Sequence, residues 1–138
     1  MTLLKNKVKA FSKELLPEII AIRRHLHAHP ELSFQEFKTS EYVCSKLNEF
    51  NIEYKAGWVK TGIVAMVYGK NPSKKIIALR ADLDALPIQE TNTVSYRSQN
   101  EGVMHACGHD VHTASLLGVA KILTELKDEF EGTVKFIF

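Results

Sequence analysis

The chain has 138 residues, of which 45% are hydrophobic and 25% are charged, a composition typical of a single globular domain and unlike that of a disordered or fibrous protein. Its net charge of +2 comes from 18 basic and 16 acidic residues spread along the chain. Because no basic run concentrates positive charge as a nucleic-acid-binding surface requires, we expect no nucleic-acid partner.

The N-terminal segment and the cysteines predict the compartment. Residues 1–16 alternate charged and apolar side chains, unlike a secretory signal, and no apolar run in the chain reaches membrane-spanning length. Cys44 and Cys107 are too few for a disulfide framework, so we expect reduced thiols. These features predict a cytoplasmic protein without a membrane partner.

Helical spacing of apolar residues predicts two helices in the first fifty residues. Apolar side chains recur every three or four positions through residues 4–26, and Pro17 should kink or split this element because it lacks a backbone N–H. Ser33 and Glu36 form a capping-box pattern, which predicts that a second helix begins there and continues to residue 50.

The periodicity changes after residue 51. Residues 52–55, 62–68 and 75–80 are short runs rich in branched side chains and predict strands. Near-continuous apolar runs predict burial on both faces of the sheet. A helix is predicted over residues 111–127 and a further strand over residues 132–138. This order of elements predicts an α/β fold with helices covering a sheet.

Residues 104–113, MHACGHDVHT, concentrate groups that bind transition metals. Thiolate and neutral imidazole are favoured ligands, and Cys107 and His109 can bind one ion if the chain turns sharply at Gly108. Three interpretations stay open: a closed structural zinc site, an open catalytic site, or a buried thiol and histidine without metal. A nucleophilic Cys107 fits less well, because a nucleophile and its base usually lie far apart in sequence.

Several neighbouring polar residues have structural explanations. Asp110 lies where the predicted helix begins, so it could cap free N–H groups or orient a ligating imidazole. The three histidines within residues 25–29 lie near the end of the first predicted helix, where we expect structural roles. Cys44 shares a helical face with apolar residues and is predicted to lie in the core.

A second cluster of polar groups follows the predicted strand 75–80. Asp82 and Asp84 are two residues apart, and alternation along an extended chain places both carboxylates on the same side. Ligands of open α/β sheets bind beyond the carboxyl ends of the strands, so this position favours metal binding or acid–base chemistry. The alternative is that the two acids cap a turn or pair with Arg80.

Three segments together carry a family resemblance: residues 23–32 (RRHLHAHPEL), residues 79–90 (LRADLDALPIQE) and residues 104–113. In this order they resemble the aminoacylase/carboxypeptidase branch of the M20 metallopeptidase family, which includes hippurate hydrolases, N-acetyl-diaminopimelate deacetylases and auxin-conjugate amidohydrolases. The resemblance implies a zinc-exopeptidase-like three-layer α/β sandwich. Residues 1–138 would be the N-terminal part of its catalytic domain, without the lid or dimerisation domain.

The resemblance also implies a function, namely hydrolysis of the amide bond of N-acyl amino acids or small peptides by water bound between two divalent ions. Cys107 and His109 correspond to metal ligands, and Asp84 corresponds to an active-site aspartate that supports a ligating histidine or the metal site. Asp82 lies where other branches carry a histidine ligand, so with Asp110 it is a supporting candidate. His112 fits the pattern as a substrate-side or structural residue. Zn, Mn, Ni and Co all suit such a site.

Family members continue after the strand 132–138 into a Gln-Pro-Ala-Glu-Glu-like segment that supplies the general base and a further ligand. We therefore expect the 138 residues alone to be inactive. The alternative is a non-catalytic metal-binding or oligomerising module. If the 138 residues fold alone, we expect self-association into a homo-oligomer or low solubility, because the strand 132–138 and an open sheet edge would expose apolar surface.

Overall fold

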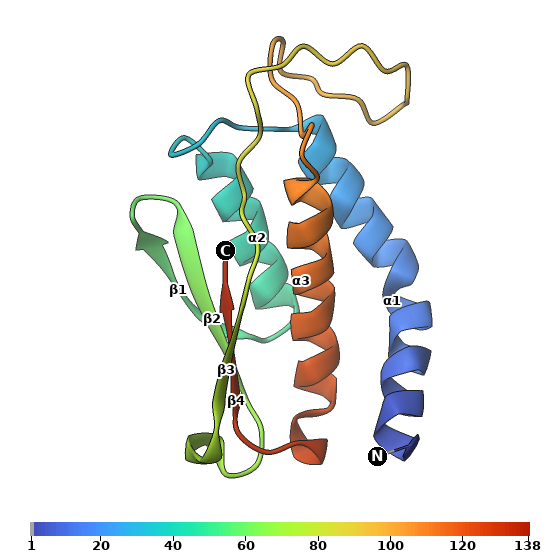
Figure 1. Ribbon diagram of the computed structural model, residues 1–138, viewed down its shortest axis with the longest axis vertical. Coiled ribbons are helices and arrows are strands. Elements are labelled where there is room, and N and C mark those ends of the chain that lie inside the picture. The colour runs from blue at the N-terminus through green and yellow to red at the C-terminus, as the bar shows by residue number, and fades with distance from the viewer. Residues whose placement is uncertain (1) are drawn as a thin grey trace.

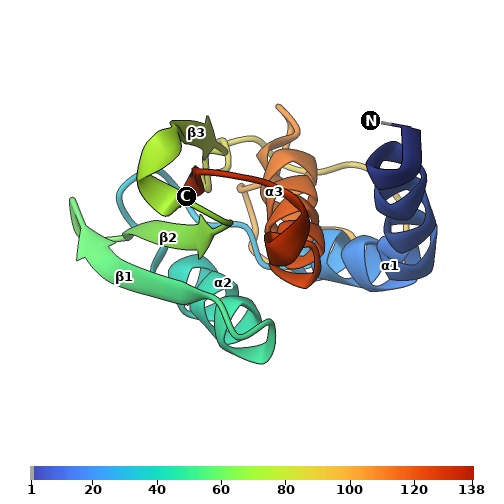
Figure 2. The same ribbon diagram turned by 90° about the horizontal axis from the view of Figure 1, so that it is seen from below.

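The computed structural model describes residues 2–138 as a four-stranded sheet with three helices on one of its faces (Figures 1 and 2). The predicted α/β class is confirmed. Helices α2 and α3 contact the sheet, whereas α1 packs against α3. Because these residues place helices on one face only, they form two of the layers of the predicted three-layer sandwich and leave the other face of the sheet open.

The elements follow the predicted order. They are α1 (Thr2–Ala28), α2 (Phe37–Glu49), β1 (Glu53–Trp58), β2 (Gly62–Tyr68), β3 (Ile76–Arg80), α3 (His109–Glu125) and β4 (Thr133–Ile137), with short 3-10 turns at Pro72–Lys74 and Lys127–Glu129. The two 3-10 turns lie at element boundaries and were not predicted. The long connection between β3 and α3 extends beyond the end of the helices (Figure 1, yellow to orange).

Of the two outcomes predicted for Pro17, helix α1 shows a kink and not a split. The helix changes direction along its length but is not split, and Pro17 lies inside it (Figure 1). Packing against α3 supports the continuous helix, since Ile22 and Leu26 are buried in the core and Ile19 contacts Gly118 of α3. Tertiary packing therefore outweighs the loss of one backbone hydrogen bond at proline.

Helix α2 begins without the predicted capping box. Glu36 is the residue before the helix, but its carboxylate accepts a hydrogen bond from the Thr61 hydroxyl at 2.8 Å and makes no cap. Glu31 takes the capping role instead, because its carboxylate accepts hydrogen bonds from the backbone N–H and the hydroxyl of Thr39, both at 2.8 Å. Loop conformation brings this earlier glutamate to the helix N-terminus.

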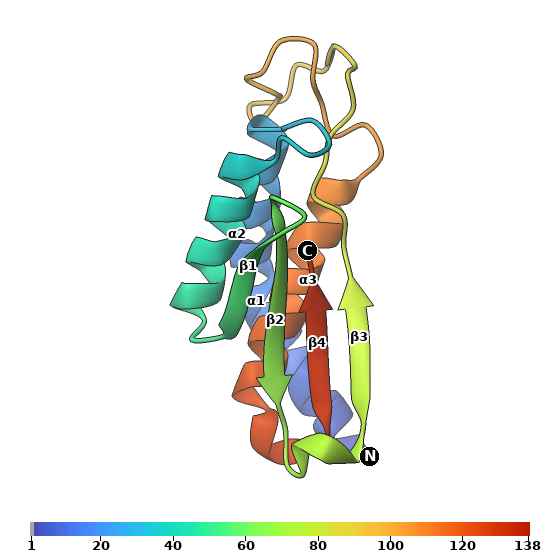
Figure 3. The same ribbon diagram turned by 90° about the vertical axis from the view of Figure 1, so that its left-hand side faces the viewer.

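The strands lie in the order β1-β2-β4-β3. The β1/β2 and β2/β4 pairs are antiparallel, whereas β3 and β4 are parallel, so the carboxyl ends of β3 and β4 lie at the same edge of the sheet (Figure 3). Helix α3 makes the connection between these two parallel strands, as parallel pairing requires a crossover.

Two predictions about exposed surface are wrong in detail. Strand β4 lies inside the sheet, so residues 132–138 do not form the exposed edge. The edge strands are β1 and β3, and the five residues of β3 are all exposed, including Ile76 and Ile77. The prediction that the strands are buried on both faces therefore fails for β3 and also for β1, in which only Tyr54 is partly buried.

The core lies between the sheet and helices α2 and α3. Its fully buried members include Val43, Leu47, Leu117 and Phe136. Cys44 is half-buried against this core, and burial raises the pKa of its thiol. Cys44 and Cys107 are both free, as expected for reduced thiols.

Within residues 2–138, no helix combines the length and apolarity needed to cross a membrane. The cytoplasmic location stays a prediction.

Candidate metal centre

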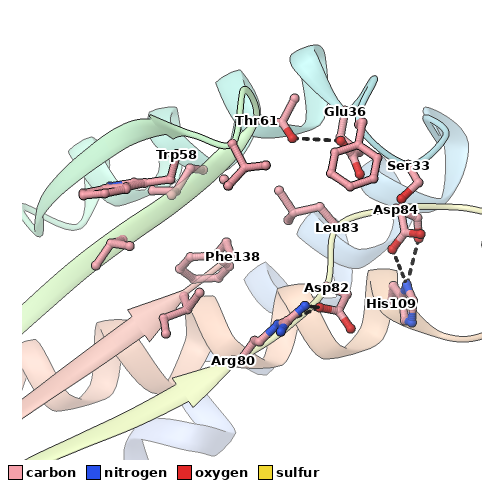
Figure 4. A pocket seen from close by; sticks show the side chains of 16 residues that line it. Ser33, Glu36, Trp58, Thr61, Arg80, Asp82, Leu83, Asp84, His109 and Phe138 are labelled. Carbon is pink, nitrogen blue, oxygen red and sulfur yellow. Dashed lines mark hydrogen bonds and ion pairs between the residues drawn. The ribbon is translucent and has the colours of Figure 1, made fainter.

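The extended segment after β3 presents its two aspartates on one side, as predicted. Ala81, Leu83 and Ala85 are buried, whereas Asp82 and Asp84 are partly exposed and point the other way (Figure 4). The Thr113 hydroxyl, one turn into α3, donates a hydrogen bond to the Asp82 backbone carbonyl at 3.0 Å. This contact fixes the segment against the N-terminal part of α3.

The two aspartates have different partners. Asp82 forms an ion pair with Arg80, with 2.7 Å between Oδ1 and a guanidinium nitrogen, and its side chain is 46% exposed. This is the structural alternative considered for the pair. Asp84 instead faces His109, whose Nδ1 lies 2.9 Å from both the Asp84 backbone carbonyl oxygen and its Oδ1 (Figure 4). Only Asp84 is therefore in contact with a predicted metal ligand.

This contact determines how His109 can bind a metal. A carbonyl oxygen only accepts hydrogen bonds, so Nδ1 must carry the proton. In the neutral ring the lone pair then lies on Nε2, the other ring nitrogen. Histidine ligands of metals usually have this arrangement, in which a carboxylate or carbonyl holds the ring and raises its basicity. Asp84 is thus placed to orient His109 for metal binding.

The turn before α3 has the predicted geometry. Gly108 has a φ of +99°, in the left-handed region, and an added Cβ would find no atom within 4 Å. Helix α3 begins at the next residue, His109, two residues earlier than predicted. Cys107, just before the turn, is exposed and free. These observations contradict the interpretation of Cys107 as a buried core thiol.

A cleft of about 510 Å³ lies at the carboxyl ends of β3 and β4. Asp82, Asp84 and His109 line one part of it, and the β1–β2 hairpin lines another with Trp58 and Val59 (Figure 4). Its size is in the range of small-molecule sites. The sequence-based expectation of a crevice beyond the strand ends is confirmed.

The donors for a metal are incomplete within this chain. Among residues 2–138, no three His, Cys, Asp or Glu side chains come together in a way that could hold an ion. Since a structural zinc site needs four ligands, the described residues do not form the closed site considered above. Cys107 and His109 stay predicted metal donors, and a metal bound there would need further ligands from outside these residues.

Asp110 does not cap α3. Its side chain is buried, with Oδ2 2.7 Å from His27 Nδ1 and 2.9 Å from Arg23 Nε, both on α1. These contacts draw the carboxylate away from the free N–H groups of its own helix. His112 is exposed on α3, with its ring centroid 6.1 Å from that of His109.

Sequence reasoning missed a group of buried polar side chains beneath the turn, here called the buried charge cluster and defined as Arg23, His27, Glu90 and Asp110. His27 Nε2 lies 3.1 Å from Glu90 Oε1, and the side chains of His27, Glu90 and Asp110 are at most 6% exposed. The members come from three segments far apart in sequence, so no local spacing signals them. Among the three N-terminal histidines, only His27 belongs to the cluster.

The surroundings keep Glu90 ionised. Burial would raise the pKa of this carboxyl, but hydrogen bonds from the Ser98 backbone N–H, the Asn92 side chain and His27 lower it to about 2. Nearby His105 is also buried, and within residues 2–138 neither of its ring nitrogens has a partner. Burial lowers the pKa of His105 to about 4, so it is neutral at physiological pH.

Comparisons with known proteins agree with this geometry. Residues 78–138 match the model of peptidase family M20/M25/M40. The chain is 50% identical to an N-acyl-L-amino acid amidohydrolase of Geobacillus stearothermophilus, over 97% of this chain and 36% of that protein. The chain belongs to the M20 peptidase family. It is also 46% identical to thermostable carboxypeptidase 2 of Saccharolobus solfataricus, over 96% of this chain and 34% of that protein.

A solved M20 structure has the same fold. The Bacillus subtilis YXEP protein, described as a dinuclear metal-binding peptidase of the M20 family, superposes with a TM-score of 0.83 and 47% identity over 94% of this chain and 35% of that one. The M20 chain described here thus spans about a third of the length of the relatives it matches.

Proposed function

We propose that these residues are the N-terminal part of the catalytic domain of a metal-dependent amidohydrolase that cleaves N-acyl amino acids or small peptides. The observation that carries this proposal is the contact between Asp84 and His109 at the edge of a cleft, with the free Cys107 two residues before His109 in the chain. The names of the amidohydrolase and carboxypeptidase relatives support this substrate class.

Each residue has a defined part in the proposed site. His109, through Nε2, and Cys107, as a thiolate, are metal donors, and Asp84 orients His109. Asp82 lines the same cleft but is paired with Arg80, so it supports the site from its edge. Divalent ions bound here, such as Zn, Mn, Ni or Co, would lower the pKa of a water and polarise the amide carbonyl.

The site needs groups from outside the 138 residues. Two donors and a supporting aspartate do not complete a two-ion centre, and a general base must lie within hydrogen-bond reach of the attacking water. The description of the B. subtilis relative as dinuclear supports two ions. We therefore propose that the lid, the general base and the remaining ligands belong to a longer reading frame and that this chain alone does not hydrolyse amides.

The deciding experiment is a Cys107→Ala substitution in the protein expressed from the complete reading frame. Metal content and the rate of N-acyl-amino-acid hydrolysis are measured together, and both should fall. Cys44→Ala is the matched control, since it removes the other thiol from the α2 side of the core. Unchanged metal content and rate in Cys107→Ala would contradict the proposal.

The exposed apolar strand β3 favours a second candidate, an oligomerising or metal-binding module without catalysis. Metal binding and hydrolysis measured on the 138-residue chain distinguish the two proposals. A native stop codon after Phe138, together with metal binding by this chain, would favour the module. Hydrolysis by the 138 residues alone would contradict the inactivity that we propose for them.

A further inference from the structure

The buried charge cluster joins three parts of the fold around the proposed metal site. His27 on α1 lies between two carboxylates, with Nδ1 2.7 Å from Asp110 Oδ2 and Nε2 3.1 Å from Glu90 Oε1. Each ring nitrogen of His27 thus faces a carboxylate oxygen, and Nδ1 also lies 3.2 Å from a guanidinium nitrogen of Arg23. Arg23 Nε lies 2.9 Å from the same Asp110 oxygen and places a positive charge beside this carboxylate.

Such a cluster is a poor source of stability. Burying charged groups costs several kcal/mol for each ion, and well-packed apolar residues of similar volume often stabilise a fold as well or better. The side chains of His27, Glu90 and Asp110 are nevertheless almost completely buried. The cluster instead fixes how its side chains, and the segments that carry them, lie relative to one another, because each hydrogen bond sets the position of both partners.

The position of Asp110 in the buried charge cluster affects the position of His109. Asp110 follows it in the first turn of α3, and the two side chains point to different parts of the fold, Asp110 to α1 and His109 to Asp84. The turn is therefore held from two sides. If the contact to α1 is lost, the first turn of α3 keeps only its contacts to the segment after β3, and we expect His109 to shift relative to Asp84 and Cys107.

Glu90 extends the same support to the long connection before α3. Its carboxylate accepts hydrogen bonds from the Ser98 backbone N–H and the Asn92 side chain. The same connection pairs through the backbone groups of Leu86 and Met104, three residues before Cys107. Among residues 2–138, His27 is the one side chain with a polar contact to both Asp110 and Glu90, so it joins α1 to the connection before the Cys107–His109 turn and to the helix after it.

We propose that His27 is a positioning residue of the metal site, which holds the first turn of α3 through Asp110 and thereby sets the position of His109. This inference rests on the proposed function, since it takes Cys107 and His109 as metal donors. It assigns His27 no contact with the ion or the substrate.

The two ring nitrogens of His27 allow a specific test. In His27→Asn the amide nitrogen lies near the position of Nδ1 and keeps the contact to Asp110, whereas in His27→Gln it lies near the position of Nε2 and keeps the contact to Glu90. His29→Gln is the matched control, because His29 lies two residues further along the chain, is exposed, and bonds only the backbone carbonyl of His25.

The protein from the complete reading frame is titrated with Co²⁺, and the Cys107 thiolate-to-Co²⁺ absorption and the dissociation constant are recorded. We expect His27→Gln to raise the dissociation constant about tenfold and to change the Co²⁺ spectrum, as loss of outer support around a metal site typically does. His27→Asn should stay close to wild type, and His29→Gln should be identical to it. Thermal unfolding of each variant, followed by circular dichroism, establishes that it is folded during the titration.

The outcomes distinguish failure of the proposed function from failure of the positioning role of His27. If wild type binds no Co²⁺, or binds it without thiolate absorption, the proposed function fails and the inference fails with it. If wild type binds Co²⁺ through Cys107 but folded His27→Gln has the same spectrum and affinity, only the inference is overturned. Equal losses in the Asn and Gln variants would also overturn it, because the contact to Asp110 would then not matter. If His27→Gln does not fold, Asp110→Asn replaces it, with the same expected loss of affinity and the same contradicting result.

Discussion

His109 Nδ1 lies 2.9 Å from both the backbone carbonyl oxygen and the Oδ1 of Asp84, and these two oxygens hold the imidazole with Nε2 free. The pair joins the segment after β3 to the first residue of α3, so it depends on the packing of two elements that are 25 residues apart in sequence. In the M20 family member described here, this contact distinguishes Asp84 from its neighbour Asp82.

Removal of the Asp84 carboxylate should weaken metal binding. In Asp84→Ala the backbone carbonyl remains as an acceptor, but the ring loses its charged partner, so we expect an affinity loss of about tenfold. Asp82→Ala is the matched control, and the loss of its exposed ion pair with Arg80 should change affinity by less than about threefold. Competition titration with a chromophoric chelator measures both in the protein from the complete reading frame. Equal effects of the two substitutions would contradict the assignment.

Gly108→Ala should strain the turn between the two proposed metal donors. The φ of +99° is unfavourable for residues with a Cβ, which gives an expected loss of about 1–2 kcal/mol in the free energy of unfolding. Since an added Cβ meets no atom within 4 Å, the loss comes from the backbone and not from a clash. Gly108→Asn should lose less, because asparagine tolerates this region better. Urea unfolding followed by circular dichroism measures the free energy of unfolding of each variant. An alanine variant as stable as wild type would contradict the turn geometry.

Glu90 predicts a specific dependence of stability on pH. Its pKa falls from an ordinary value of 4.5 to about 2 in the folded chain, so ionised Glu90 stabilises the fold above pH 4.5. This stabilisation should be lost progressively as the pH falls from about 4.5 to about 2. The difference in free energy of unfolding between wild type and Glu90→Gln should therefore be constant near neutral pH and shrink in this window. A difference that stays constant down to pH 2 would show that Glu90 is not held in its charged form.

The exposed edge strand β3 predicts self-association of the 138-residue chain. Ile76 and Ile77 are 61% and 45% exposed on a strand with an open edge, a surface that pairs readily with another strand. Ile76→Lys should reduce the apparent mass in light scattering at high concentration. Leu16→Lys is the control, since it adds the same charge at an exposed apolar position of α1. A wild-type chain that stays monomeric would contradict the prediction.

The sequence predicted elements well where the signal is local. Apolar residues at helical spacing located the helices, short runs rich in branched side chains located the strands, and the turn at Gly108 followed from the conformational freedom of glycine. Predictions failed where a distant contact competes with a local one. Glu36 bonds Thr61 instead of capping α2, and Asp110 bonds α1 instead of capping α3. In both cases a tertiary hydrogen bond replaces the local one.

The strand at the open edge of the sheet was also not predictable from local sequence patterns. Residues 132–138 read as a strand, but no local pattern tells whether a strand lies at an edge or inside a sheet. Pairing with both β2 and β3 places β4 inside and leaves β3 exposed. Strand order depends on long-range pairing, which sequence spacing does not encode.

The amino-acid sequence alone determined the α/β class, the order of elements, the sharp turn between Cys107 and His109, and the resemblance to the M20 family, because each depends on side-chain type and spacing along the chain. Only the tertiary structure decided that Asp84 and not Asp82 contacts His109, and that His27 joins Asp110 to Glu90. These pairs form between segments that are distant in sequence, so their geometry exists only when the helices pack against each other and against the sheet.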